Sequence, residues 1–154
     1  MQPRMNHPVY VIPEAMEALQ ALSKSAHVDG LSPALHALIH LRASQINGCS
    51  ACVQIHSREM KQAGEPDTRI YAVGAWRDTN YFNDAERAAL ALTEALTRQA
   101  DRPDPVSDEL WNEATRLFDE KQLSAILVSI ASINVWNRLN ASVRQTPPDE
   151  WLRN

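Results

Sequence analysis

The chain has 154 residues, enough for one domain with its own hydrophobic core. Its 44% hydrophobic and 22% charged residues exclude a disordered chain, a collagen and a disulfide-dense mini-protein. A net charge of -4 without any basic run argues against a nucleic-acid-binding protein, because phosphate binding depends on clustered cations.

The sequence predicts one helical domain over residues 13–146, between an extended arm at 1–12 and a tail at 147–154. Only four glycines are present, too few for the many tight turns of an all-β protein of this length. About seven helices are expected, at 13–26, 33–47, 50–63, 68–76, 85–98, 107–118 and 119–144.

Local signals mark the ends of several of these helices. Ser32 followed by Pro33 is a helix start, and Gly48 tolerates the left-handed geometry of a helix end. The last helix has an apolar stripe at helical spacing, made of Leu123, Ile126, Leu127, Ile130, Ile133 and Asn137. No segment alternates apolar and polar residues over any length, so we expect an all-α fold that self-associates.

No segment approaches the roughly 20 apolar residues that a membrane-spanning helix needs, and we expect no contact with a membrane. The first thirty residues lack the apolar run of a signal peptide, which favours a cytoplasmic location.

Two cysteines, Cys49 and Cys52, are the only thiols of the chain. In a reducing compartment, a C-x-x-C pair is more typical of redox chemistry or metal binding than of a structural disulfide.

The candidate catalytic residues are Cys49, Cys52 and His56, in the spacing C-x-x-C-x-x-x-H. If a helix begins near Cys49, both sulfurs lie in its first turn, close enough to bond. The helix N-terminus carries roughly half a positive charge, which favours the thiolate. His56 lies one turn beyond Cys52 on the same face, where it can take or return a proton. These are the minimum components of a peroxide-reducing or disulfide-exchanging site.

Two other interpretations of this motif stay open. The cysteines can be inert buried residues, or they can bind a metal with His56 and a fourth ligand from His36 or His40. The absence of a second C-x-x-C pair argues against a structural zinc site. The His36–His40 pair also lacks the glutamate that a metalloprotease helix needs. We therefore expect no bound metal or cofactor.

Three asparagines, Asn134, Asn137 and Asn140, recur at a spacing of three on the last predicted helix. Asparagine is a poor residue for a helix interior unless its amide has a partner, so we expect hydrogen bonds across a helix–helix or subunit contact. The tryptophans Trp76, Trp111 and Trp136 are interpreted as core or interface anchors.

Four segments of this chain resemble the alkylhydroperoxidase D-like branch of the carboxymuconolactone decarboxylase superfamily. The strongest is L-R-A-S-Q-I-N-G-C-x-x-C-x-x-x-H at residues 41–56, and the others lie at 75–77, 84–90 and 133–139. The resemblance covers roughly residues 7–145. It implies an all-helical subunit that assembles into homo-trimers or homo-hexamers, with sites near the subunit contacts.

The resemblance also implies an activity, a thiol-dependent peroxidase acting in antioxidant defence. Carried over onto this chain, Cys52 is the attacking thiol, Cys49 the resolving thiol and His56 part of the proton relay. The electron donor in such relatives is a dithiol, a dihydrolipoyl group on a partner protein.

The chain departs from the family pattern at one position of the relay. The pattern has a glutamate twelve residues before the first cysteine, where this chain has Ala37. His40, on the same helix face, is a candidate replacement, and Glu86 and Glu59 are the candidate carboxylates. Without a carboxylate beside it, His56 would be a weaker proton acceptor.

Other functions remain alternatives to the peroxidase. The cysteine pair also suits a disulfide oxidoreductase without peroxidase turnover, and the loss of the glutamate at position 37 suits a non-catalytic oligomeric stress protein. A carboxymuconolactone-type decarboxylase is the least favoured, because the superfamily's decarboxylases do not depend on this cysteine pair.

Overall fold

The computed structural model describes residues 2–100 and 102–147, and this part of the chain contains helices and no strand. The elements are α1 (Pro8–Val11), α2 (Pro13–Ser25), α3 (Pro33–Asn47), α4 (Ser50–Gln62), α5 (Asp67–Ala72), the 3₁₀ helix η1 (Val73–Asp78), α6 (Asp84–Thr97), α7 (Asp108–Leu117) and α8 (Glu120–Val143). The predicted all-α class is confirmed, and the seven predicted helices correspond to α2–α8.

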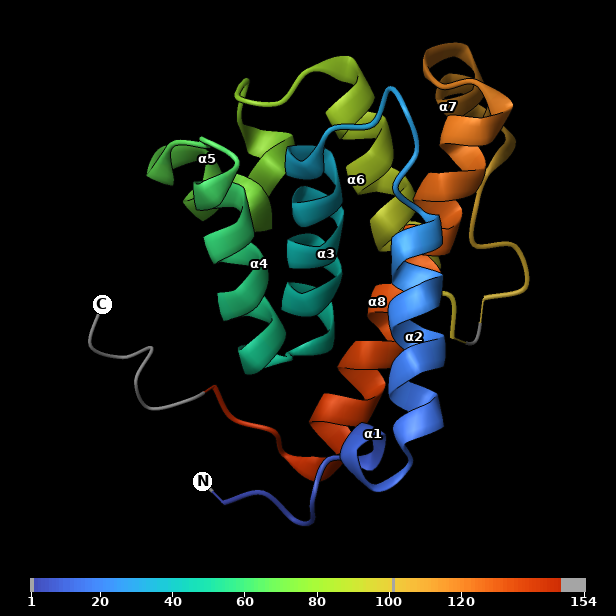
Figure 1. Ribbon diagram of the computed structural model, residues 1–154. Coiled ribbons are helices and arrows are strands. Elements are labelled where there is room, and N and C mark those ends of the chain that lie inside the picture. Colours follow the sequence, from blue (N-terminus) through green and yellow to red (C-terminus); the bar gives the residue numbers. More distant parts are fainter. Residues whose placement is uncertain (1, 101, 148–154) are drawn as a thin grey trace.

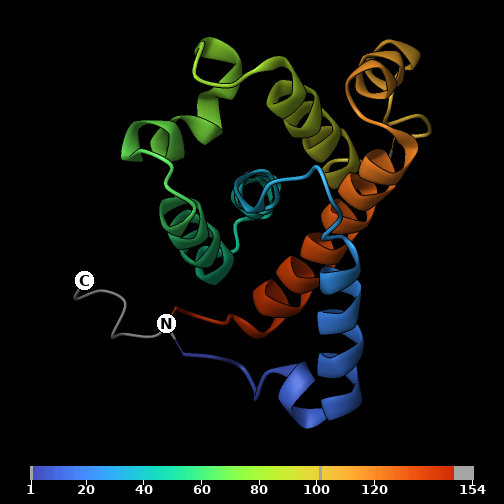
Figure 2. The same ribbon diagram turned by 45° about the horizontal axis from the view of Figure 1, so that its top comes forward.

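Helix α3 is the centre of the fold. Figure 2 shows it nearly end-on, surrounded by α4, α5, α6 and α8. It packs against α4, α6 and α8, and its residues 35–39, 41, 43 and 44 are buried. A helix that is apolar around most of its circumference belongs in a core, and α3 accordingly has side chains in its contacts with α4, α6 and α8.

The predicted helix signals act as expected. Ser32 Oγ accepts a hydrogen bond from the Leu35 amide at 3.1 Å, and α3 ends at Gly48 with a φ of 68°. Asn83 with Glu86 and Asp119 with Gln122 form reciprocal capping boxes at the starts of α6 and α8.

The expectation of an extended arm over residues 1–12 is wrong for its second half, where α1 forms. His7 keeps the extended backbone that a residue before proline prefers, and its ring accepts a hydrogen bond from the Val9 amide. The side chain of His7 thus caps a helix that Pro8 begins. The Arg4 amide donates to the Val143 carbonyl at 2.9 Å, so the arm also packs against the end of α8.

The predicted helix at 68–76 is interrupted. The α-helical part ends at Ala72, and η1 continues with a non-helical residue, Ala75, whose φ is -122°. This break places Trp76 in the core, 4% exposed, where its Nε1 donates to Glu94 at 2.9 Å. Burial of the indole and of its donor group outweighs the local preference for a continuous helix.

The predicted stripe of α8 is buried, except that Leu127 is only partly so. Helix α2 packs on α8 and α1 along the outside, as Figure 1 shows, and none of its residues is fully buried. Within the described residues, no helix combines the length and the apolar character that crossing a membrane requires. The expected tail lies, apart from Pro147, outside the described residues.

Candidate active site

The cysteine pair lies where the chain passes from α3 to α4. Gly48 ends α3 in the left-handed conformation, so that Cys49 becomes the N-cap of α4 and Cys52 its third residue. The two are joined by a disulfide, with Cα atoms 5.3 Å apart. The Cys52 amide donates to Cys49 Sγ at 3.3 Å, which directs the positive end of the helix at this sulfur. The predicted helix start at the cysteines is confirmed.

A cavity of about 770 Å³ opens beside the disulfide, walled by residues of α2, α3, α4 and α8. The lining residues that bear on chemistry are Cys52, His56 and Glu59 of α4, His36, Ala37 and His40 of α3, and Trp136 and Asn140 of α8. Cys49 is not among the lining residues. Of the two sulfurs, that of Cys52 therefore faces the space that a substrate can enter.

The asparagines of α8 connect this helix to the turn that carries the cysteines. Asn47 Nδ2 donates to the side-chain oxygens of Asn134 and Asn137, at 3.0 and 2.9 Å, which confirms the predicted helix–helix hydrogen bonds. Asn140 differs from these two, because its Nδ2 donates to Cys52 Sγ at 3.3 Å. Hydrogen bonds to a sulfur favour its charged form, so Asn140 is a functional candidate that the sequence analysis assigned only to packing.

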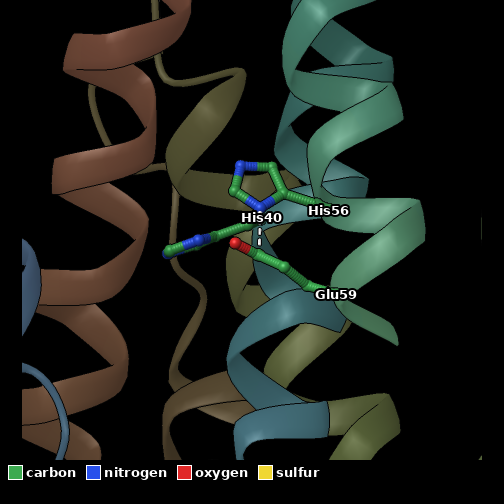
Figure 3. A group of neighbouring side chains, drawn as sticks. All are labelled: His40, His56 and Glu59. Carbon is green, nitrogen blue, oxygen red and sulfur yellow. Dashed lines mark hydrogen bonds and ion pairs between the residues drawn. The ribbon is translucent and has the colours of Figure 1, made fainter. Parts of the chain in front are cut away.

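Cys52 and His56 both line the cavity from α4, one turn apart. His56 Nδ1 lies 2.7 Å from Glu59 Oε2, one turn further along α4, and His40 of α3 meets the His56 ring edge-on at 4.8 Å between centroids (Figure 3). Glu59 thus provides the carboxylate beside the histidine, and its side chain is 47% exposed at the cavity.

His40 also contacts α8. Its Nε2 lies 2.9 Å from Ser129 Oγ, and the same hydroxyl lies 3.2 Å from His36 Nδ1. Burial, together with the neighbouring histidines His56 and His36, holds the pKa of His40 well below its usual value, so its imidazole is neutral at neutral pH. Burial and His27 lower the pKa of His36 in the same way.

Ser129 is the residue of this site that the sequence analysis missed. It lies beside Ile126 and Ile130 in the buried stripe of α8, and it is itself 2% exposed. A hydroxyl in an apolar stripe needs a partner, and this was the available signal for an interaction with the histidines of α3.

The structure does not bring Glu86 to the cysteine pair. Its carboxylate accepts from the Asn83 amide at the start of α6 and forms an ion pair with Arg69 at 2.5 Å. The other candidate for the relay, His40, does lie beside His56. Of the two carboxylates proposed from the sequence, only Glu59 therefore reaches the histidine.

One group of side chains has a metal-binding arrangement. The donor atoms of His40, His56 and Glu59 lie within 4.8 Å of one another. The metal set considered from the sequence had both cysteines as ligands, whereas in this structure their sulfurs are bonded to each other.

The sequence of residues 13–95 matches the model of the Carboxymuconolactone decarboxylase family. The chain belongs to this family. Its membership of the alkylhydroperoxidase D-like branch is shown by a solved structure from Agrobacterium tumefaciens, a protein of unknown function described as a putative antioxidant defence protein AhpD. The two chains are 32% identical and superpose with a TM-score of 0.87, over 96% of this chain and 99% of that one.

The chain is also similar to a second bacterial protein in sequence and to a debrominase in structure. This member of the Carboxymuconolactone decarboxylase family is 31% identical to the uncharacterized protein YdfG of Bacillus subtilis, over 86% of this chain and 89% of YdfG. The debrominase Bmp8, in a complex with 2,3,4-tribromopyrrole, superposes with a TM-score of 0.81 at 21% identity, covering 94% of this chain and 76% of that one. At that identity the likeness shows the fold alone.

The alkylhydroperoxidase D-like chain differs from its family pattern in the origin of the carboxylate. Ala37, at the position of the pattern's glutamate, is 4% exposed and contributes only a methyl group to the cavity wall. Glu59 approaches His56 from α4 instead, three residues along the same helix. The contact between a histidine and a carboxylate is thus present, with the carboxylate on a different helix from that in the pattern.

Proposed function

We propose that this protein is a thiol-dependent peroxidase that reduces hydroperoxides through Cys49 and Cys52. The observation that carries the proposal is the disulfide at the N-terminus of α4, with Cys52 facing a cavity that also holds the His56–Glu59 pair. This chemistry requires two thiols close enough to form a disulfide, a positive helix end beside them and a proton acceptor.

The reaction divides into three balanced steps. The Cys52 thiolate attacks the terminal peroxide oxygen, the O–O bond breaks, and the alkoxide leaves as an alcohol with a proton from the relay, which gives a sulfenic acid on Cys52. The Cys49 thiol then displaces this hydroxyl as water and forms the disulfide. A dithiol donor reduces the disulfide through a mixed disulfide and is itself oxidised, which restores both thiols.

The contacts of each sulfur support this division of roles. Cys52 lines the cavity and accepts a hydrogen bond from Asn140, which stabilises a thiolate at the point where a peroxide arrives. Cys49 lies behind it and accepts the Cys52 amide, which stabilises Cys49 as the thiolate released when the disulfide is reduced. His56 takes the thiol proton and Glu59 stabilises the imidazolium.

We further propose a dithiol of the dihydrolipoyl type as the electron donor and a homo-oligomer as the working form. The first follows from the family resemblance. The second is supported by an apolar surface on the N-terminal helices, where Tyr10, Val11 and Ile12 are 74%, 56% and 54% exposed and α2 has no buried residue. Surfaces of this kind on a small protein are typical of contacts between subunits.

The test is peroxide consumption by the reduced protein, with dihydrolipoamide compared against dithiothreitol as reductant. Wild type should turn over, Cys52→Ser should be inactive, and Cys49→Ser should stop after one turnover with a sulfenic acid or mixed disulfide detectable by mass spectrometry. Unimpaired turnover by Cys52→Ser would refute the assignment. Exchange with a disulfide substrate in the absence of any peroxide turnover would favour the disulfide oxidoreductase instead.

A further inference from the structure

We propose that His40, His56 and Glu59 form a binding site for a divalent transition-metal ion, represented by Zn²⁺, that does not use the cysteines. The three side chains converge from α3 and α4, as Figure 3 shows, and all three line the cavity. The inference is independent of the peroxidase activity, because it concerns a ligand set that exists while the disulfide is closed.

The donor set suits this class of ion. Two imidazoles and one carboxylate are the protein ligands of a common kind of zinc site, which keeps its fourth position open to water or substrate. With metal–ligand bonds of about 2.0–2.2 Å, tetrahedral donors lie roughly 3.4 Å apart. The present atoms lie within 4.8 Å of one another, and the closest pair, His56 Nδ1 and Glu59 Oε2, at 2.7 Å. The three donor atoms therefore lie about 1.4 Å or less beyond the spacing that a tetrahedral ion requires.

The surroundings of His40 match those of a metal ligand. A ligating histidine usually donates its other ring N–H to an oxygen, which fixes the ring and leaves the remaining lone pair for the metal. Ser129 Oγ is at 2.9 Å from His40 Nε2 and can accept this hydrogen bond, while its own proton goes to His36 Nδ1 at 3.2 Å. This arrangement leaves the lone pair of His40 Nδ1 for the metal ion.

Access and charge also favour a cation. Glu59 is 47% exposed and the cavity opens to solvent, which gives the ion a path to the site. Among the described residues that line the cavity there is no lysine or arginine, and Glu59 is the one carboxylate. An ion here would replace the proton shared by His56 and Glu59, and it would occupy the two groups that the proposed peroxidase uses. Metal binding and proton relay would exclude each other.

The experiment is a titration of tag-free, fully oxidised protein with Co²⁺, followed by the visible absorption of the bound ion, and with Zn²⁺ by calorimetry. We expect one ion per chain. Loss of a hydrogen-bond partner of a metal ligand costs roughly 10–100-fold in affinity, and Ser129→Ala should weaken binding within that range. Glu59→Gln and His40→Gln, which remove ligands, should each weaken it by more.

Two controls separate this site from its neighbours. His27→Gln alters another histidine of the same cavity and should leave the affinity unchanged, as should the double variant Cys49→Ser/Cys52→Ser. Thermal melts without metal show whether each variant is folded, and Glu59, being half exposed, is the substitution that the fold tolerates best. Absence of binding to wild type at millimolar Co²⁺, equal affinity in Glu59→Gln, or loss of binding in the cysteine variant would each overturn the proposal.

Discussion

Two clusters of polar side chains lie on different faces of α3, and they are built in opposite ways. On one face, Arg42 reaches the buried carboxylate of Glu94, which also accepts from Trp76 and pairs with Arg77 and Arg98. On the other face, His36 and His40 line the cavity, and His36 Nε2 is buried without a hydrogen-bond partner.

The first cluster stabilises the fold, whereas the second has polar groups that a ligand can reach. Every oxygen of Glu94 is satisfied by protein groups, so this cluster has no capacity left for a ligand and serves to join α3, η1 and α6. At the cavity, polar groups face solvent-accessible space and the Glu59 carboxylate is half exposed. A polar group left open at a cavity is available to a substrate, whereas a saturated one is not.

The largest effect on chemistry should come from His56. His56→Ala removes the proposed proton acceptor, and we expect kcat/KM for a hydroperoxide to fall by about 10²–10⁴, the usual contribution of general acid–base catalysis. Stopped-flow oxidation of the reduced protein measures this rate. Added imidazole should restore part of it, because the small base can enter the cavity; a variant that reacts within threefold of wild type would exclude His56 from the relay.

The largest effect on stability should come from Glu94. Glu94→Gln leaves Arg42, whose side chain is only 12% exposed, without its counter-charge, and breaking such a buried pair costs about 3–5 kcal/mol. Urea unfolding measures the loss. Glu113→Gln is the matched control, because it removes one partner of an exposed pair with Arg116 and should cost no more than about 1 kcal/mol. Equal losses in the two variants would contradict the distinction between the clusters.

The Glu94 cluster also predicts how stability depends on pH. Burial raises the pKa of Glu94, but hydrogen bonds from Trp76, Arg77 and Arg42 outweigh it and lower the pKa from 4.5 to about 2. The ionised carboxylate therefore stabilises the native state above pH 4.5, by about 3 kcal/mol, and this contribution is lost as the pH falls toward 2.

Unfolding of wild type and Glu94→Gln should be compared between pH 6 and 2.5. The difference between their free energies of unfolding should shrink as the pH falls, because the other carboxylates contribute equally to both proteins. A difference that stays constant with pH would show that the pKa of Glu94 is the same in the native and unfolded states, and would contradict the prediction.

The sequence predicted the helices well because their ends are encoded locally. Ser32 with Pro33, the Asn83 and Asp119 capping boxes and Gly48 each act within three or four residues of where they stand. The break at Ala75 could not be predicted in this way, since it results from the distant contact between Trp76 and Glu94. The helix at Pro8 depends likewise on the His7 side chain, which caps it.

The placement of the candidate site residues was predictable where they share a helix. Cys49, Cys52 and His56 follow from their spacing on α4, and Glu59 could be named as a candidate. The sequence could not choose between Glu59 and Glu86, because that choice depends on how α4 and α6 are turned in the fold, and Arg69 binds Glu86 elsewhere. Ser129 was missed because only the packing of α8 on α3 brings it to His40.

The smallest expected effect concerns Ala37, and it revises what the sequence alone suggested. If this position lacked its relay acid, Ala37→Glu would speed the reaction. Because Glu59 already contacts His56 at 2.7 Å, we expect Ala37→Glu in wild type to change the rate by less than about threefold. Glu59→Gln should lower it by about tenfold, since the imidazolium loses its counter-charge.

The informative variant combines the two: Ala37→Glu placed in the Glu59→Gln background should recover most of the rate if a carboxylate from α3 can replace the one from α4. A thermal melt must accompany each rate, because Ala37 is 4% exposed and an unpaired carboxylate there is costly to bury. A folded double variant that remains as slow as Glu59→Gln would show that the carboxylate must come from α4, and that the two positions are not equivalent.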